Sequence, residues 1–84
     1  MKEIVIFGNR DLAEMAYFYF TQTGKKVKGF TMDNPEEGSF MGRPMYDFKD
    51  ITATCSVQDH LMFAPIYGIN TRKKIYNKIK ELGY

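Results

Sequence analysis

Three short segments contain the residues best suited to bind a ligand: residues 8–11 (Gly-Asn-Arg-Asp), Asp33 with Asn34, and residues 67–72 (Tyr-Gly-Ile-Asn-Thr-Arg). A helix N-terminus offers unpaired N–H groups and a partial positive charge. A helix that begins near Asp11 could therefore hold a phosphate, to which Arg10 would add a full charge. Asp33 is suited to accept hydrogen bonds from a ribose or a base. These residue types indicate a ligand that carries phosphate.

Each of these residues also has a purely structural interpretation. Gly8 could serve only a tight turn, Asp11 could serve only as a helix cap, and Asp33 could be a solvated aspartate in the turn before Asn34-Pro35. The two interpretations are about equally favoured for Asp11 and Asp33. A dinucleotide-binding fingerprint needs three glycines, whereas the first segment has only Gly8, so NAD is disfavoured.

The remaining reactive side chains do not form a catalytic pattern. Cys55 and His60 are the single cysteine and the single histidine of the chain, and nothing in the sequence places them together as a nucleophile and a base. No second cysteine or histidine can complete a metal site. We expect neither a catalytic residue nor a bound metal.

Three predicted strands position the polar segments. Ile4 to Phe7 and Leu61 to Ala64 are uninterrupted apolar runs, typical of strands that are buried on both faces of a parallel sheet. Val27 to Met32 is a third strand candidate of mixed polarity. Each run ends just before one of the polar segments, so we expect the segments to lie at the carboxyl ends of the strands.

Two amphipathic helices are predicted between and after these strands. Asp11 to Gln22 has the apolar spacing of one helical face, and Gly24 supplies its stop. The second helix is predicted from the spacing of Ile75, Ile79 and Leu82, with lysines on the opposite, solvated face. Asn70 or Thr71 could cap its start, and Gly83 closes it.

The order of these elements is that of a doubly wound α/β fold. We predict a small three-layer Rossmann-like parallel sheet in the strand order 2-1-3, with helices after strands 1 and 3. Residues 39–59 give a weak pattern: 42–44 (Gly-Arg-Pro) should break any element, 45–48 could be extended, and 47–51 could form a helical turn. A ligand crevice is expected beyond the carboxyl ends of the strands, where the polar segments converge.

Composition limits the classes of protein. The 84 residues allow one domain, 1–84, and 12 basic against 10 acidic residues is too balanced to indicate a nucleic-acid partner. No apolar run is long enough to span a bilayer or to form a signal peptide, and a single cysteine excludes a disulfide framework. We expect a cytoplasmic domain, and the end at Gly83-Tyr84 suggests the N-terminal part of a longer protein.

The first helix is unusually rich in aromatic residues. Every residue from Leu12 to Phe20 except Glu14 is apolar or aromatic, so the four at 17–20 cannot all face one sheet. They could be amphipathic surface side chains, or they could dock another subunit or a further domain through Tyr17, Phe18 and Phe20. The sequence slightly favours docking.

Four stretches of the chain together resemble a known family. They are residues 2–20 (KEIVIFGNRDLAEMAYFYF), 27–35 (VKGFTMDNP), 40–48 (FMGRPMYDF) and 70–84 (NTRKKIYNKIKELGY). In this order and spacing they look like the N-terminal domain of bacterial sugar acyltransferases, of the sialic acid O-acetyltransferase and bacillosamine acetyltransferase type. The similarity covers nearly the whole chain.

The resemblance implies a domain that binds a nucleotide sugar and is followed by a left-handed β-helix of hexapeptide repeats. In that family the β-helix trimerises, binds acetyl-CoA and supplies a histidine base. Those repeats are absent here, so no catalytic residue can be assigned, His60 does not match the family's histidine, and this domain itself would bind no cofactor. The implied partners are a UDP-sugar-type small molecule and the missing β-helix domain.

The family's motifs can be carried onto this chain. Its phosphate turn falls on residues 8–11, its acid after the second strand on Asp33, and its Ala-Ile-Gly segment with the following Asn and Arg on residues 65–72. The substrate-binding residues are then Gly8, Asn9, Arg10, Asp11, Asp33, Tyr67, Gly68, Asn70 and Arg72. Asn9 and Arg10 replace small residues of the family, and Met32 stands where its paired acid begins. Tyr67 occupies a glycine position, where it could block the crevice or stack on a base.

Three functions are therefore compared. The first is the substrate-binding domain of a sugar O- or N-acetyltransferase in bacterial surface-glycan biosynthesis, with Arg10 and the helix N-terminus at the diphosphate, Asp33 at the base or ribose, and Asn70 and Arg72 on the far wall. The second is an assembly domain without a ligand, which a closed crevice and a buried Tyr67 would support. The third, a dinucleotide-binding module, is disfavoured by the missing glycines.

Overall fold

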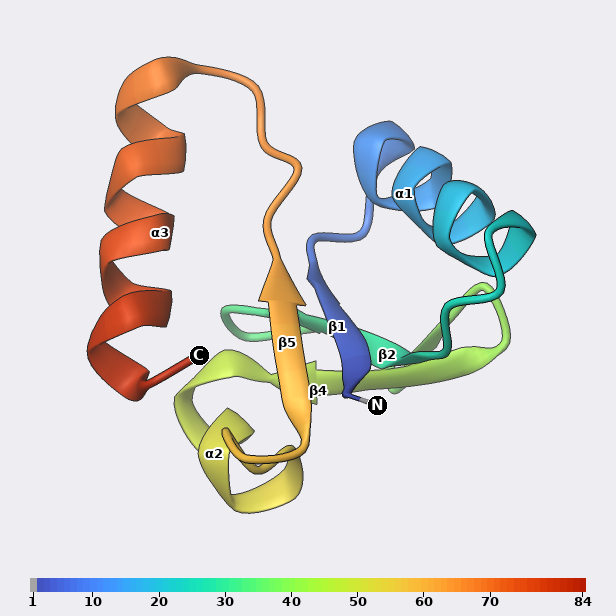
Figure 1. The fold of residues 1–84 in the computed structure, drawn as a ribbon. Helices are drawn as coiled ribbons and strands as arrows, with labels where there is room; N and C mark the ends of the chain where they lie inside the picture. The colour runs from blue at the N-terminus through green and yellow to red at the C-terminus, as the bar shows by residue number, and fades with distance from the viewer. Residues whose placement is uncertain (1) are drawn as a thin grey trace.

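Residues 2–84 form five strands and three α-helices in a small α/β fold. The structure is a computed structural model that describes residues 2–84 (Figure 1). In chain order the elements are β1 (Glu3–Phe7), α1 (Asp11–Gln22), β2 (Val27–Met32), β3 (Ser39–Phe40), β4 (Arg43–Asp47), the 3-10 turn η1 (Phe48–Asp50), α2 (Ile51–Thr54), β5 (His60–Phe63) and α3 (Ile69–Leu82). The predicted α/β class is confirmed, as are helices after the first and last predicted strands.

The sheet is larger than predicted. Its strand order is β3-β4-β2-β1-β5, in which β4, β2, β1 and β5 run parallel and β3 is antiparallel to β4. The predicted three-stranded sheet in the order 2-1-3 is therefore wrong. The three strands that the sequence indicated are neighbours as β2-β1-β5, and residues 39–47 extend the sheet beyond β2.

A tight hairpin explains the two extra strands. Met41 and Gly42 both have positive φ, 54° and 75°, as two-residue turns of type I′ require. Gly42 therefore joins β3 to β4 instead of breaking the element. Pro44 pairs with Ser39 in the antiparallel ladder and precedes the parallel ladder, which begins at Met45 opposite Phe30. A Cβ on Gly29 would lie 2.6 Å from the Pro44 carbonyl oxygen, so only glycine lets β4 approach β2 there.

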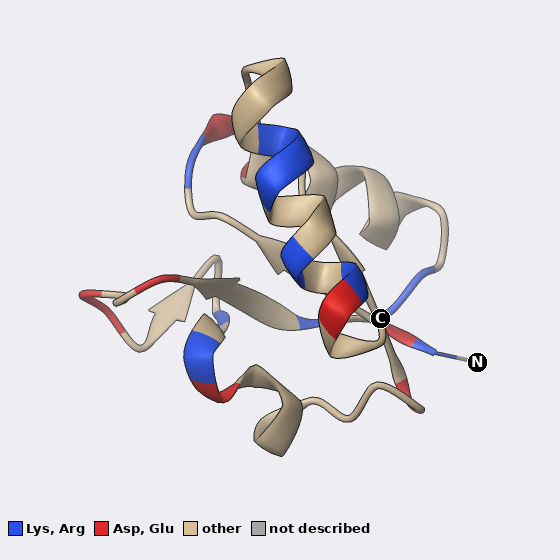
Figure 2. Ribbon diagram, turned by 90° about the vertical axis from the view of Figure 1, so that its left-hand side faces the viewer, with Lys and Arg blue, Asp and Glu red and all other residues tan. Residues whose placement is uncertain are grey.

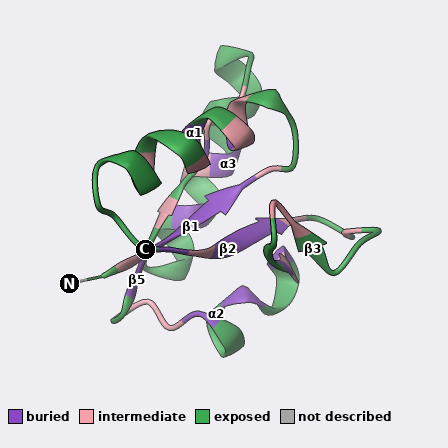
Figure 3. Cartoon of the chain, turned by 90° about the vertical axis from the view of Figure 1, so that its right-hand side faces the viewer, coloured by how far each residue is buried: buried purple, intermediate pink, exposed green. Residues whose placement is uncertain are grey.

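Helices cover both faces of the sheet, and β1 contributes to both cores. Ile4 and Ile6 join the core beneath α1, which also contains Ala13, Ala16, Val27, Phe30 and Met45. Val5 and Phe7 join the core beneath α2 and α3, which also contains Phe48, Ile51, Cys55, Ala64, Ile75 and Ile79. The burial colouring shows β1 and β2 at the centre of the protein (Figure 3). The three-layer arrangement is thus as predicted.

The α1 aromatic residues divide between the core and the surface. Tyr17 and Phe20 are half-buried and pack on the core beneath α1, whereas Phe18 is 48% exposed and Tyr19 is 63% exposed. This division confirms that the four cannot all face the sheet. Of the three predicted docking residues, only Phe18 is freely accessible, and Met15 and Tyr19 are the other exposed apolar side chains of α1.

Strand β5 forms one edge of the sheet and is only partly covered. Leu61 is 50% exposed and Phe63 is 38% exposed, so the prediction of a strand buried on both faces is wrong. Phe63 packs against α1 through an edge-to-face contact with the ring of Phe20, whose centroid lies 5.3 Å away. Leu61 and part of Phe63 remain in contact with solvent.

Both long helices end as predicted, but α3 begins earlier than expected. Gly24 and Gly83 have φ of 80° and 106°, and the N–H groups of Lys25 and Tyr84 return to the carbonyls of Phe20 and Ile79. The predicted cap at Asn70 or Thr71 is wrong. The N-cap residue is instead Gly68, whose φ is 86°, so the helix begins at Ile69. No side-chain hydrogen bond caps this end of the helix.

The outer face of α3 is cationic. Lys and Arg segments lie along its length (Figure 2), whereas Ile75 and Ile79 face the core and Leu82 is exposed. The solvated lysine face is confirmed. None of the helices within residues 2–84 is long and apolar enough to cross a membrane.

Candidate binding cleft

A cleft of about 900 Å³ opens at the carboxyl ends of β1, β2 and β5. Its lining includes residues of the connection from β1 to α1 and of the connection from β5 to α3. Figure 1 shows the course of these two connections. The predicted binding residues among its walls are Gly8, Asn9, Arg10, Asp11, Asp33 and Tyr67. We call this space the main cleft. Gly68, Asn70 and Arg72 do not line it, although Thr71 of α3 does.

The N-terminus of α1 reaches the main cleft without a cap. Arg10 is the N-cap residue in an extended conformation, with no side-chain capping bond, and the first intrahelical bond runs from the Glu14 N–H to the Arg10 carbonyl at 3.0 Å. Asp11 is the first helical residue, so the interpretation of Asp11 as the cap is wrong. The N–H groups of residues 11–13 come before that first bond, which leaves them available to an anion in the cleft.

Gly8 shapes the turn into the cleft. Its φ is 124°, a backbone conformation that residues with a side chain rarely adopt. Its N–H donates to the Thr31 carbonyl at 2.8 Å. A Cβ at this position would meet only Ala13, at an ordinary 3.6 Å. The glycine is therefore required for the backbone conformation and not for space.

Charged groups of both signs line the main cleft. Arg10 faces the same space as Asp11 and Asp33. The two ion pairs found within residues 2–84, Lys26 with Glu3 and Lys49 with Asp47, lie elsewhere, so the guanidinium of Arg10 is held by neither. An anion would bind at Arg10 and the helix N-terminus, whereas the two carboxylates suit hydroxyl or N–H donors.

Tyr67 stands at the open side of the cleft. Its side chain is 78% exposed, and Gly68, with φ of 86°, follows it before α3 begins. The crevice is open, so the arrangement that would have favoured a ligand-free assembly domain is not found. The ring presents an accessible face to a planar group in the cleft.

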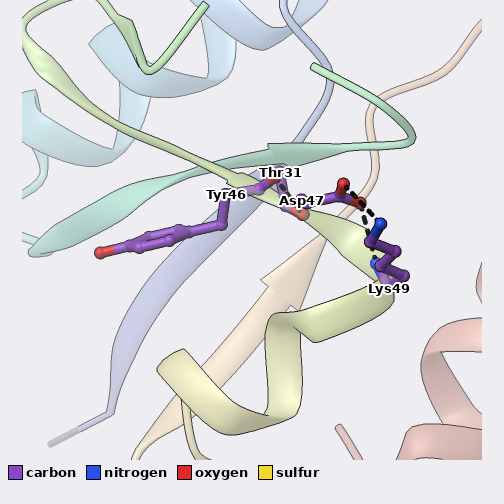
Figure 4. Close-up of polar contacts among 4 residues, drawn as sticks. All are labelled: Thr31, Tyr46, Asp47 and Lys49. Atoms are coloured by element: carbon purple, nitrogen blue, oxygen red, sulfur yellow. Dashed lines mark hydrogen bonds and ion pairs between the residues drawn. The ribbon is translucent and has the colours of Figure 1, made fainter.

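Hydrogen bonds fix the strand ends from which Met32 and Asp33 emerge. The Thr31 hydroxyl, fully buried, donates to the Tyr46 carbonyl at 3.0 Å, and the Asp47 carboxylate accepts from the Lys49 N–H at 3.2 Å (Figure 4). The same carboxylate pairs with the Lys49 ammonium at 3.8 Å. Asp47 is thus engaged in local structure, and the end of β2 is held rigidly against β4.

Sequence reasoning missed a second hollow of about 530 Å³ beside the main cleft. Its polar lining comes mainly from the turn between β2 and β3, with Asn34, Glu36 and Glu37, and from Ser39 at the start of β3. We call it the side hollow. The turn sequence Asp33 to Gly38 was recognised only as turn chemistry, and its run of polar side chains after a central strand was the available signal.

Cys55 and His60 are both buried. Burial raises the pKa of the Cys55 thiol, and the side chain lies in the core beneath α2 and α3. His60 is buried, with Nδ1 2.9 Å from the Ser56 carbonyl oxygen. Neither residue lines the main cleft or the side hollow. Among residues 2–84 there is also no group of three His, Cys, Asp or Glu side chains arranged to hold a metal ion.

Comparison with known proteins adds no relative. No protein-family model matches this chain, and no curated protein sequence matches it.

Proposed function

We propose that this chain binds a nucleotide-diphosphate sugar and serves as the substrate-binding domain of a sugar O- or N-acetyltransferase in bacterial surface-glycan biosynthesis. The observation that carries the proposal is the main cleft, because six of the nine residues selected from the sequence line one open space at an uncapped helix N-terminus. Acyl transfer from acetyl-CoA would take place on another domain, and this one would orient the sugar.

The roles of the residues follow from their charges. The diphosphate would bind at the N–H groups of residues 11–13 and at the Arg10 guanidinium, since both attract anions. Asp33 would accept hydrogen bonds from the ribose or the base. Asn70 and Arg72 lie on the exposed first turn of α3, so they would meet only a part of the ligand that extends beyond the cleft.

Calorimetric titration of the chain with UDP and with inorganic pyrophosphate tests this proposal. We expect Arg10→Ala to lower the affinity for both ligands by about tenfold, as the loss of a charge-assisted hydrogen bond does. Asp33→Ala should lower the affinity for UDP and leave the affinity for pyrophosphate nearly unchanged, because pyrophosphate has no ribose or base. Direct phosphate contacts should also weaken as salt rises.

The matched control is Lys78→Ala, which removes one positive charge on exposed α3 and should leave both affinities unchanged. Equal losses of pyrophosphate binding in Arg10→Ala and Asp33→Ala would contradict the assigned roles. Absence of UDP and pyrophosphate binding would reject the proposed function. Saturable NADH binding in their place would favour the dinucleotide module.

An assembly function is the second candidate, and the exposed apolar side chains favour it. Phe18 and Tyr19 of α1 and Leu61 of edge strand β5 are between 48% and 63% exposed. Concentration-dependent self-association in sedimentation experiments, lost in Phe18→Ser and accompanied by no nucleotide binding, would support this candidate over the first.

A further inference from the structure

The main cleft and the side hollow adjoin each other at the start of α1. Asn9, Arg10 and Met32 line both spaces. Arg10 therefore lies at the boundary and can reach a group placed between the two. This arrangement suits a ligand with a central anionic group at Arg10 and two chemically different ends, one in each space.

The two spaces differ in chemistry. Beyond the shared residues, the main cleft has apolar walls from both sides, including Leu12, Ile66 and the exposed ring of Tyr67. The side hollow has instead an amide, a hydroxyl and two carboxylates, from Asn34, Ser39, Glu36 and Glu37, and its apolar lining includes Phe40 and Met45. A planar base suits the first environment, and a ring that carries many hydroxyl groups suits the second.

We infer that the side hollow is the glycosyl subsite, which accepts a neutral or amine-bearing sugar and rejects a sugar that carries a carboxylate. The inference rests on the proposed function and assigns an orientation to its ligand. The base lies against Tyr67 and the ribose near Asp33, both in the main cleft. The diphosphate sits at Arg10, and the sugar extends into the side hollow.

The charge of the side hollow gives it this selectivity. Glu36 and Glu37 are its charged residues apart from Arg10, and Arg10 is occupied by the diphosphate in this arrangement. Carboxylates accept hydrogen bonds from hydroxyl groups and attract an ammonium group, but they repel another carboxylate. Both glutamates are exposed, so solvent limits the effect to a few-fold in affinity.

Titration of the chain with UDP, UDP-glucose, UDP-glucosamine and UDP-glucuronic acid at low salt tests the subsite. We expect UDP-glucosamine to bind about fivefold more tightly than UDP-glucuronic acid, the range that exposed charge pairs supply. The double variant Glu36→Gln/Glu37→Gln should abolish this difference and leave the affinity for UDP unchanged. Tyr67→Ala should weaken all four ligands by a similar factor, because each contains the base.

The control is the double variant Glu14→Gln/Glu81→Gln, which changes the net charge equally but outside both spaces. If it also abolishes the difference, the selectivity arises from overall charge and the subsite is rejected. If UDP binds but the four ligands do not separate, the subsite is rejected while the proposed function stands. If UDP itself fails to bind, both are rejected.

Discussion

The two ends of the parallel sheet are built in opposite ways. At the amino ends of the strands, hydrogen bonds join segments that are far apart in the sequence, and we call this the closed end. At the carboxyl ends, the connections border the main cleft, and polar groups of Arg10, Asp11 and Asp33 line it. The contacts of the C-terminal Tyr84 thus lie at one end of the sheet and the candidate binding groups lie at the other.

The closed end is held by contacts between segments far apart in the sequence. The Tyr84 hydroxyl donates to the carbonyl oxygens of Cys55 and Ile51, and the Glu3 N–H donates to the Asp59 carbonyl at 3.0 Å. His60 and Ser56 add a further contact within the segment before β5. The cleft can stay open without loss of these contacts, because the contacts that hold Glu3 and Tyr84 lie at the amino ends of the strands.

Removing the Tyr84 side chain is expected to have the largest effect on stability. Tyr84→Ala deletes a half-buried ring that packs on the core beneath α2 and α3, together with its hydrogen bonds. We expect the free energy of unfolding in urea to fall by about 2 kcal/mol. UDP affinity should not change, because Tyr84 lies far from the main cleft. A loss of binding without a loss of stability would contradict the separation of the two ends.

A matched pair of glycine substitutions compares the ends directly. Gly24 lies at the closed end with φ of 80°, and Gly68 lies beside the cleft with φ of 86°. A Cβ at Gly24 has nothing within 4 Å, and one at Gly68 is nearest to the Thr71 hydroxyl at 3.9 Å, so space limits neither. Each change to alanine should lower the free energy of unfolding by about 1 kcal/mol through backbone conformation alone.

The pair should differ in ligand binding. Gly68 follows Tyr67 directly, so Gly68→Ala should shift the ring and weaken UDP, whereas Gly24→Ala should leave UDP affinity unchanged. Calorimetry on both variants, with urea unfolding as the measure of stability, provides the comparison. Equal UDP affinities in the two variants would show that the connection before α3 does not shape the cleft.

The sequence predicted the parts of the fold that depend on local patterns. Apolar runs located β1 and β5, a stretch of mixed polarity located β2, helical spacing located α1 and α3, and Gly24 and Gly83 marked the helix ends. The place of the cleft was predictable because parallel strands bring their carboxyl ends to one edge. Six of the nine binding residues therefore came together as expected.

The errors in the sheet and in the site depend on contacts between distant residues, whereas the two wrong helix caps depend on local backbone conformation. The hairpin of β3 and β4 requires the close approach of Pro44 to Gly29, 15 residues earlier, which no local pattern reveals. The exposure of Leu61 depends on how far α1 extends over β5. The side hollow depends on how the turn after β2 folds back beside Arg10, so its residues could not be selected from spacing.

The smallest predicted effect is a dependence of stability on pH at the closed end. Burial raises the pKa of the Tyr84 hydroxyl from its ordinary value of 10.0, so the folded protein favours the protonated form. This contribution to stability is complete below the pKa of the unfolded chain and is lost as pH rises through the higher pKa of the folded state. The loss between about pH 8 and about pH 10.5 should be a few tenths of a kcal/mol, since the group is partly solvated.

Urea unfolding at these two pH values tests whether the Tyr84 hydroxyl is held against the Cys55 carbonyl at the amino ends of the strands. Burial also raises the pKa of the Cys55 thiol from 9.0, so Tyr84→Phe should reduce the loss of stability at high pH without abolishing it. Tyr19→Phe is the matched control, because it removes a hydroxyl from an exposed ring on α1 and should retain the full loss. If Tyr84→Phe and Tyr19→Phe behave alike, the hydroxyl of Tyr84 is not held against the Cys55 carbonyl. The closed end would then lack the hydrogen bond that joins the C-terminal residue to the segment before β5.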